Sequence, residues 1–232
     1  MTPKRKIWFE DNRSKKIVYI SHCLLNQNCR YPGIATSDGI IVEILEPLLR
    51  KGIGIEQLPC LECMEWGGVS RNSILKFLPI IRKYSYSKLS PFIKLFSKIW
   101  YWNYKRLCKR EAKKVANQIK DHLNSGYTIL GLISMNDSPT CGVTKTLDLL
   151  GSIFKYRELE IDLEDFEHPK LEKMRNLIPK LLVDGEGTFM HELVAKLKKL
   201  KQDIKIIGFN PWDNLDEEVN KIKNQIFTNE AI

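Results

Sequence analysis

The 232-residue sequence has no long apolar run of the kind that membrane-spanning proteins carry, and its first residues do not have the pattern expected of a secretory leader. No window approaches about 18 consecutive apolar residues, so a transmembrane helix is not expected. The basic stretch at residues 1–16 is followed by neither an apolar core nor a small-residue cleavage site, which a secretory signal requires. The sequence therefore predicts a cytoplasmic protein, whose six cysteines are expected to be reduced thiols, ligands or nucleophiles and not disulfides.

Acidic residues are almost absent from one segment of the chain. Residues 76–120 contain thirteen Lys and Arg but a single acid, Glu111, which gives this segment a net charge of +12. The whole chain is +9, so the remainder sums to −3 and the excess is local. The same region is rich in aromatic residues: Tyr84, Tyr86, Trp100, Tyr101, Trp102 and Tyr104.

Three interpretations of this basic, aromatic segment stay open. It is typical of a helical lid that packs its aromatic side chains inward and leaves its lysines in solvent. It is also typical of an RNA-binding surface, in which residues 76–120 would contact tRNA through stacked bases and phosphates. A basic amphipathic helix that carries tryptophan also suits the surface of an anionic membrane.

Apolar runs alternate with helical patterns along the chain. Helices are expected from Ser37 to Gly52, over Leu107–Leu123 and over Thr188–Leu200. Strands are expected at Lys16–Ser21, Gly54–Pro59, Tyr127–Ser134, Leu181–Asp184 and Lys205–Phe209. This alternation predicts an α/β fold, with a Rossmann-like, mostly parallel open sheet and helices on both faces. We expect one domain over residues 1–232, with a basic, aromatic helical insertion at 70–106.

Four cysteines lie in loops that follow three predicted strands. Cys23 follows the first strand, Cys60 and Cys63 follow the second, and Cys141 follows the third. Because parallel strands bring their carboxyl ends to one edge of the sheet, these loops are expected to converge there. Three thiolates from three loops are the arrangement for a metal ion or an iron–sulfur cluster, whereas each cysteine alone is more often a packing residue.

The other cysteines and one histidine leave alternatives. A zinc site normally has four nitrogen or sulfur ligands, and His22 is available as the fourth. Cys29 and Cys63 are candidates to replace one of the three ligands. Cys108 lies in the basic helical segment and is expected to be a packing thiol. The spacing C-x-x-x-C-x-x-C does not occur, so a radical-SAM cluster is not indicated.

Three motifs in order, "SHCLLNQNCRYPG", "LPCLECMEWGG" and "NDSPTCGV", resemble the thiouracil desulfidase family, and "DGEGTF" resembles a later glycine-rich turn of that family. The resemblance implies that Cys23, Cys60 and Cys141 hold a 4Fe–4S cluster with one iron free of protein ligands. In the family, that iron takes the substrate's sulfur and the thiocarbonyl is hydrolysed without net redox change. The family's proline–arginine signature is reduced here to "VSRNS".

The motifs also imply residues that act on substrate. Glu62 and Ser138 match positions of the family's motifs and are the predicted catalytic residues. Arg30, Asn136 and Asp137 are the predicted substrate-binding residues. For Arg30 a structural ion pair is an equal alternative, and Asp137 or Ser138 also suits a helix cap before "GVTKTLDLLG".

Two function classes follow from these observations. The first is an iron–sulfur desulfidase that acts on a small thiolated pyrimidine, free or within RNA. A soft iron prefers a soft sulfur donor, and a neighbouring carboxylate would activate water. The second is a metal-stapled module without catalytic activity that binds RNA or a membrane through its basic segment.

Overall fold

The computed structural model describes residues 11–154, 156–158, 162 and 164–227. Its central element is a four-stranded sheet in the order β2-β1-β3-β6, in which every neighbouring pair is parallel. The strands are β1 (Lys16–Ser21), β2 (Gly54–Leu58), β3 (Thr128–Met135) and β6 (Ile206–Phe209), each within two residues of its predicted bounds. The predicted α/β fold with a Rossmann-like open sheet is confirmed.

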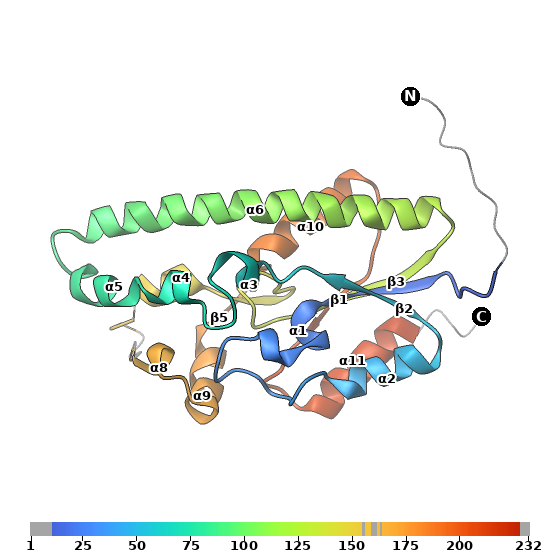
Figure 1. Ribbon diagram of the computed structural model, residues 1–232, viewed down its shortest axis with the longest axis horizontal. Helices are drawn as coiled ribbons and strands as arrows, with labels where there is room; N and C mark the ends of the chain where they lie inside the picture. Colours follow the sequence, from blue (N-terminus) through green and yellow to red (C-terminus); the bar gives the residue numbers. More distant parts are fainter. Residues whose placement is uncertain (1–10, 155, 159–161, 163, 228–232) are drawn as a thin grey trace.

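Helices cover both faces of the sheet (Figure 1). Alternate residues of β1 point to opposite faces, so Ile17 and Tyr19 belong to one core and Val18 and Ile20 to the other. The first core is closed by α6 (Ser90–Asn124) and α10 (Thr188–Lys199), and the second by α2 (Val42–Arg50) and α11 (Leu215–Phe227). Strands β1 and β3 are buried along most of their length and almost continuously apolar, as expected for a sheet that helices cover on both sides.

The predicted start of the helix at 37–52 differs from the structure. Helix α2 begins at Val42 and no side chain caps it, so the predicted start at Ser37 is wrong. Residues 39–41 are instead bonded to the segment after β1, because Gly39 O accepts from Gln27 N and Ile41 N donates to Leu24 O. Pro47 does not end the helix, since burial of Ile44, Leu45 and Leu48 against the sheet outweighs one lost hydrogen bond.

The predicted strand at 181–184 lies outside the main sheet. Strand β5 (Leu182–Asp184) pairs antiparallel with β4 (Lys145–Leu147) in a separate two-stranded ribbon. This β4 strand occupies the segment "GVTKTLDLLG" where the sequence suggests a helix, and that helix begins only later, as α7 (Leu149–Phe154). The remaining short elements are α1 (His22–Leu25), η1 (Gln27–Cys29), α3 (Leu61–Glu65), α8 (Glu164–Glu167) and α9 (Leu171–Leu181).

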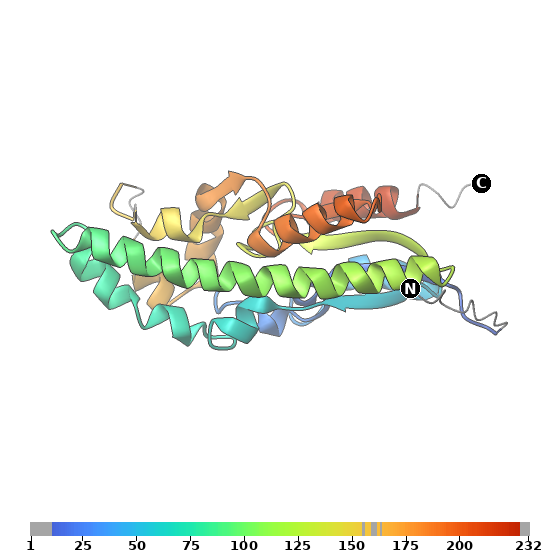
Figure 2. The same ribbon diagram turned by 90° about the horizontal axis from the view of Figure 1, so that it is seen from above.

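Residues 70–106 are largely helical, as expected of the insertion. They form α4 (Asn72–Leu75), α5 (Leu78–Tyr84) and the first half of α6, which extend past the end of the sheet in both views (Figures 1 and 2). Helix α6 continues without interruption through residue 106 into the predicted 107–123 helix, so the two form one 35-residue element. Within the described residues, neither α6 nor any other helix combines the length and the apolar character that crossing a bilayer requires.

Candidate metal centre

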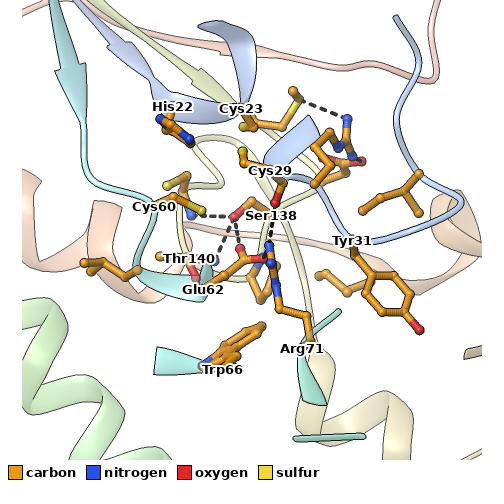
Figure 3. A pocket seen from close by; sticks show the side chains of 18 of the residues that line it. His22, Cys23, Cys29, Tyr31, Cys60, Glu62, Trp66, Arg71, Ser138 and Thr140 are labelled. Carbon is orange, nitrogen blue, oxygen red and sulfur yellow. Dashed lines mark hydrogen bonds and ion pairs between the residues drawn. The ribbon is translucent and has the colours of Figure 1, made fainter. Parts of the chain in front are cut away.

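The carboxyl ends of β1, β2 and β3 surround a cavity of about 120 Å³ (Figure 3). Strand β2 pairs with one edge of β1, and β3, which comes later in the chain, pairs with the opposite edge of β1. The cavity therefore lies at the switch point of the sheet, where open α/β folds bind ligands. We call it the thiol cavity, because its lining residues include Cys23, Cys29, Cys60 and Cys141.

The three predicted ligands reach the thiol cavity from three separate elements. Cys23 lies in α1 directly after β1, Cys60 precedes the first turn of α3, and Cys141 lies in the loop after β3. Convergence of these loops at one edge is thus what the structure shows. Cys29, at the end of η1, also lines the cavity, and Cys63 contacts it through a 3.1 Å hydrogen bond from its thiol to Cys29 O.

The closest group of sulfurs differs from the predicted set. The sulfur atoms of Cys29, Cys60 and Cys63 all lie within 4.8 Å of one another. Sulfur ligands of one tetrahedral zinc ion, with Zn–S bonds of about 2.3 Å, lie roughly 3.8 Å apart. These three cysteines could therefore hold a metal ion or part of a cluster, and Cys60 is common to both sets.

The thiols influence one another's ionisation. Burial raises the pKa of Cys141, and negative charge on Cys23 and Cys60 would raise it further. Burial also raises the pKa of Cys23 to about 12. A hydrogen bond from Cys29 lowers the pKa of Cys60 to about 6, while the same bond raises the pKa of Cys29. Full ionisation of this group is thus unfavourable unless a cation offsets the charge, as metal binding does.

Glu62 and Ser138, the predicted catalytic residues, are in direct contact. The Ser138 hydroxyl donates to Glu62 Oε1 at 2.7 Å. The same Ser138 oxygen accepts backbone N–H groups from Thr140 at 3.1 Å and Cys141 at 2.9 Å. Ser138 therefore closes the turn that carries Cys141 and also orients the Glu62 carboxylate toward the thiol cavity, which both residues line (Figure 3).

Arg71 is a site residue that we did not predict. It takes a left-handed backbone conformation with φ of 54°, and its side chain is 7% exposed. Its guanidinium donates to Cys63 Sγ at 3.1 Å and Cys29 O at 3.2 Å, and it pairs with Glu62 Oε2 at 3.4 Å. The signal in the sequence was the arginine of "VSRNS", which replaces the family's proline–arginine signature.

Three residues that line the thiol cavity each have a buried polar atom without a hydrogen-bond partner. These atoms are Arg71 Nε, Trp66 Nε1 and His22 Nδ1. Buried polar groups are rarely left unpaired in native proteins. Because the three atoms have almost no accessible surface, they do not face the open space of the cavity. The side chain of His22, which the sequence suggests as a fourth zinc ligand, lines the cavity.

Arg30 and Asp137 form a buried ion pair on the cavity wall. Their side chains are 4% and 1% exposed, and Trp212 Nε1 donates to the same Asp137 oxygen at 2.8 Å. The structure thus realises the ion-pair alternative, while both residues still line the cavity. Trp212 has no counterpart in the sequence motifs, because it follows β6 and reaches Asp137 only in the folded chain.

Asn136, a predicted substrate-binding residue, holds polar groups of the loop after β3. It lies outside the described lining of the thiol cavity. Its amide oxygen accepts N–H groups from Val143 and Thr144 at 3.2 Å, and its amide nitrogen donates to Thr144 Oγ1 at 3.1 Å. Asn136 therefore fixes the loop beyond Cys141. Cys108, by contrast, is fully buried in the core beneath α6, which confirms it as a packing thiol.

Comparisons with known proteins give one distant relative. An uncharacterized protein of Methanocaldococcus jannaschii is 28% identical over 172 residues, which cover 73% of this chain and 96% of the relative. No protein-family model matches the chain, and no solved structure matches it. The assignment of chemistry therefore depends on the site itself.

Proposed function

We propose that this chain is a non-redox desulfidase that uses a 4Fe–4S cluster to remove sulfur from a small thiolated pyrimidine. The observation that carries the proposal is the shared location of four thiols and the Glu62–Ser138 pair at one small cavity on the switch point of the sheet, with a fifth thiol, Cys63, beside them. The motif resemblance supports the same assignment.

The donor set fits an iron–sulfur cluster. Thiolates are the usual cluster ligands, and here they come from loops whose positions are fixed by the sheet. Cys23, Cys60 and Cys141 would hold the cluster, with Cys29 or Cys63 as the replacement for one of them. When bound, the cluster would supply a soft, Lewis-acidic iron that prefers a thione sulfur to an oxygen ligand.

The side chains of the chain account for the proton transfers. Glu62 is held by Ser138 on one oxygen and by Arg71 on the other, which fixes the direction of its carboxylate. From this position it would take a proton from water as the water oxygen bonds to the thiocarbonyl carbon. The carbon–sulfur bond then breaks as the remaining hydroxyl proton passes to sulfur, which leaves as hydrosulfide. The proton held by Glu62 returns to hydrosulfide and restores the carboxylate. Water and thiocarbonyl are consumed, carbonyl and hydrogen sulfide are formed, and no electrons are exchanged.

We favour a small thiolated base or nucleoside as the substrate class, because the motif resemblance points to a thiolated pyrimidine. The thiol cavity has a volume of about 120 Å³. A bound cluster would take up much of this space, so the substrate would reach the cluster from the open side of the cavity.

The test is an anaerobic assay of sulfide release by the full chain after reconstitution with iron and sulfide. The panel is thiouracil, its nucleoside and thiolated tRNA. Glu62→Gln keeps the shape of the side chain but removes the base, so turnover should fall by about 10²- to 10⁴-fold while iron content is retained. Full cluster loading without sulfide release from any member of the panel would contradict the proposal.

One observation favours a second candidate, a zinc-stapled module. The 4.8 Å limit on the sulfurs of Cys29, Cys60 and Cys63 is close to the spacing of thiolates around a single ion. Metal analysis of the purified chain separates the two. A cluster gives iron, acid-labile sulfide and visible absorbance, whereas stoichiometric zinc gives none of these.

A further inference from the structure

A second feature of the surface lies away from the thiol cavity. Among the residues that the structure describes, seventeen large hydrophobic side chains are exposed, and nine of them lie between residues 80 and 102. We call α5 together with residues 86–102 the helical arm. Of the described residues, none between 76 and 134 lines the thiol cavity, so the proposed chemistry does not explain the arm.

The exposed side chains of the arm form one stripe along α6. Leu89, Phe92, Phe96, Ile99 and Trp102 recur at intervals of three and four, which places them on one side of a helix. They are 50% to 70% exposed, with Phe92 at the upper limit. The second half of the same helix buries its apolar face in the core, so the stripe is particular to the arm.

An apolar groove lies beside the stripe. It has a volume of about 360 Å³ and runs between α5, α6 and α7. Phe92 and Phe96 belong to both the stripe and the groove, whose other walls include Phe77, Ile81 and Leu150. The views in Figures 1 and 2 agree that this part of the molecule extends past the sheet, so a flat surface can approach it.

The charge around the stripe is of one sign. Residues 76–110 contain ten Lys and Arg and no Asp or Glu, and all ten are exposed. Arg106 lies 4.8 Å from the centre of the Trp102 ring, which joins the basic side chains to the end of the stripe. Lys94, Lys98 and Lys105 occur along the same length of helix. A partner must therefore offer both an apolar layer and negative charge.

These two requirements distinguish the partners. A second copy of the chain would bring ten more cations against the first ten, so self-association through the arm is repulsive. RNA offers negative charge, but Leu89, Leu95 and Ile99 present no ring on which a base can stack, and they would remain in water. A bilayer with anionic lipid offers an apolar interior beneath a negative surface, and interfacial helices with Trp, Phe, Leu and Lys bind there.

We propose that the helical arm binds the surface of a membrane that contains anionic phospholipid. The stripe from Leu89 to Trp102 enters the boundary between headgroups and acyl chains. The lysines and Arg106 contact the phosphates. The arm would thus hold the protein on the membrane surface, with the thiol cavity elsewhere on the molecule.

Vesicle flotation of the full chain tests this proposal. One set of vesicles contains phosphatidylcholine alone, and the other also contains phosphatidylglycerol. The chain should float only with the second set, and added salt should weaken the binding. The triple variant Phe92→Ser, Phe96→Ser, Trp102→Ser should lower the partition coefficient by about tenfold or more.

A matched control uses the other exposed apolar patch. Ile40, Val42 and Leu49 are 45%, 50% and 62% exposed on or beside α2, so changing all three to Ser also removes exposed apolar side chains, but away from the arm. This control should float as the wild type does. A separate variant, Lys94→Gln, Lys98→Gln, Lys105→Gln, keeps the apolar stripe and should bind more weakly than the wild type at low salt, with the difference shrinking as salt is added.

The proposal is overturned if the wild type floats with neither set of vesicles, or if the α2 control loses as much binding as the stripe variant. Salt-sensitive binding of tRNA without vesicle binding would assign the arm to RNA. A dimer in sedimentation equilibrium that the stripe variant dissociates would assign it to a second copy. Sulfide release by the stripe variant should equal that of the wild type, so the test is independent of the proposed reaction.

Discussion

At the scale of single residues, the Cys29–Cys60 pair is the most informative feature of the thiol cavity. The two thiols share a hydrogen bond that lowers the pKa of Cys60 and raises the pKa of Cys29. One of them is therefore a thiolate at neutral pH before any metal binds. A thiolate is both the metal ligand and the nucleophile, so Cys60 is where metal binding and chemical modification compete.

This pair predicts selective alkylation of the metal-free chain. With a pKa of about 6, Cys60 should react with iodoacetamide at pH 7, and its rate should fall as the pH drops through about 6. The Cys29→Ala variant loses the hydrogen bond, so the midpoint of the rate profile should move toward the ordinary thiol value. Mass spectrometry of peptides after brief labelling measures both. An unchanged midpoint in Cys29→Ala would show that Cys29 does not set the ionisation of Cys60.

Site residues could be predicted from the sequence where they lie within a motif. Glu62 and Ser138 stand at motif positions, and the structure brings them to 2.7 Å. Arg71 and Trp212 were missed because their roles come from contacts across the fold. Arg71 has a left-handed backbone conformation and lies three residues after Gly68 in the chain. Trp212 contacts Asp137 from the loop after β6. Asn136 stays a predicted substrate-binding residue, and its contacts with Val143 and Thr144 arise only in the folded loop.

At the scale of elements, α10 fixes the loop that carries Cys141. The backbone N–H groups of Thr188 and Phe189, in its first turn, donate to Pro139 O and Thr140 O, each at 3.0 Å. These amides have no partner within their own helix, so the loop satisfies them. Gly187 stands at the start of this contact, and its own N–H donates to Gly142 O at 2.9 Å. The turn in "DGEGTF" therefore positions a predicted ligand.

Gly187→Ala should disturb this contact. A Cβ at position 187 would lie 2.5 Å from Thr140 C and O and 2.7 Å from Gly142 N, all backbone atoms that cannot rotate away. We expect a loss of about 1–3 kcal/mol in the free energy of unfolding, measured by urea denaturation, together with reduced iron loading. Gly39→Ala is the control, because a Cβ there meets nothing within 4 Å. Equal stability of the two variants would show that the loop adjusts freely.

Periodicity explains which elements were predicted well. The buried strands and α10 were found within two residues, because their apolar patterns coincide with their burial. In the first half of α6 the apolar stripe is exposed, whereas the second half has its apolar side chains buried. This change in pattern suggested that an insertion ends at residue 106, but the helix continues through that residue. Strand β5 was predicted because it is a short apolar run. Its pairing with β4 was not, because the sequence around β4 has the pattern of a helix start.

At the scale of the whole molecule, the order of the strands assembles the site. Cys23, Cys60 and Cys141 are far apart in the sequence, yet the strands that precede them are consecutive in the sheet, in the order β2-β1-β3. This convergence follows from the rule that parallel strands align their carboxyl ends, which is why it could be predicted. The placement of Cys29 and Cys63 beside Cys60 could not, because it depends on how η1 and α3 pack against each other.

Because three loops meet at one group of thiols, a bound metal or cluster would cross-link the carboxyl edge of the sheet, and its binding energy would add to the stability of the fold. At about a hundredfold excess over the dissociation constant, this linkage contributes about 2.7 kcal/mol, or roughly 5–10 °C in Tm for a chain of this size. Anaerobic differential scanning fluorimetry of loaded and metal-free protein measures that increment, and chelation should abolish it.

Single substitutions then identify the ligands, because subtracting each variant's metal-free Tm removes the cost of the lost side chain. Cys60→Ala should lose the increment under either ligand set. If the cluster is held as proposed, Cys23→Ala and Cys141→Ala should lose it too, while Cys29→Ala and Cys63→Ala keep most of it. The opposite pattern would assign the metal to Cys29, Cys60 and Cys63, whose sulfurs are the closest group within the described part of the chain. Cys108→Ala should keep the full increment, since that thiol packs in the core beneath α6.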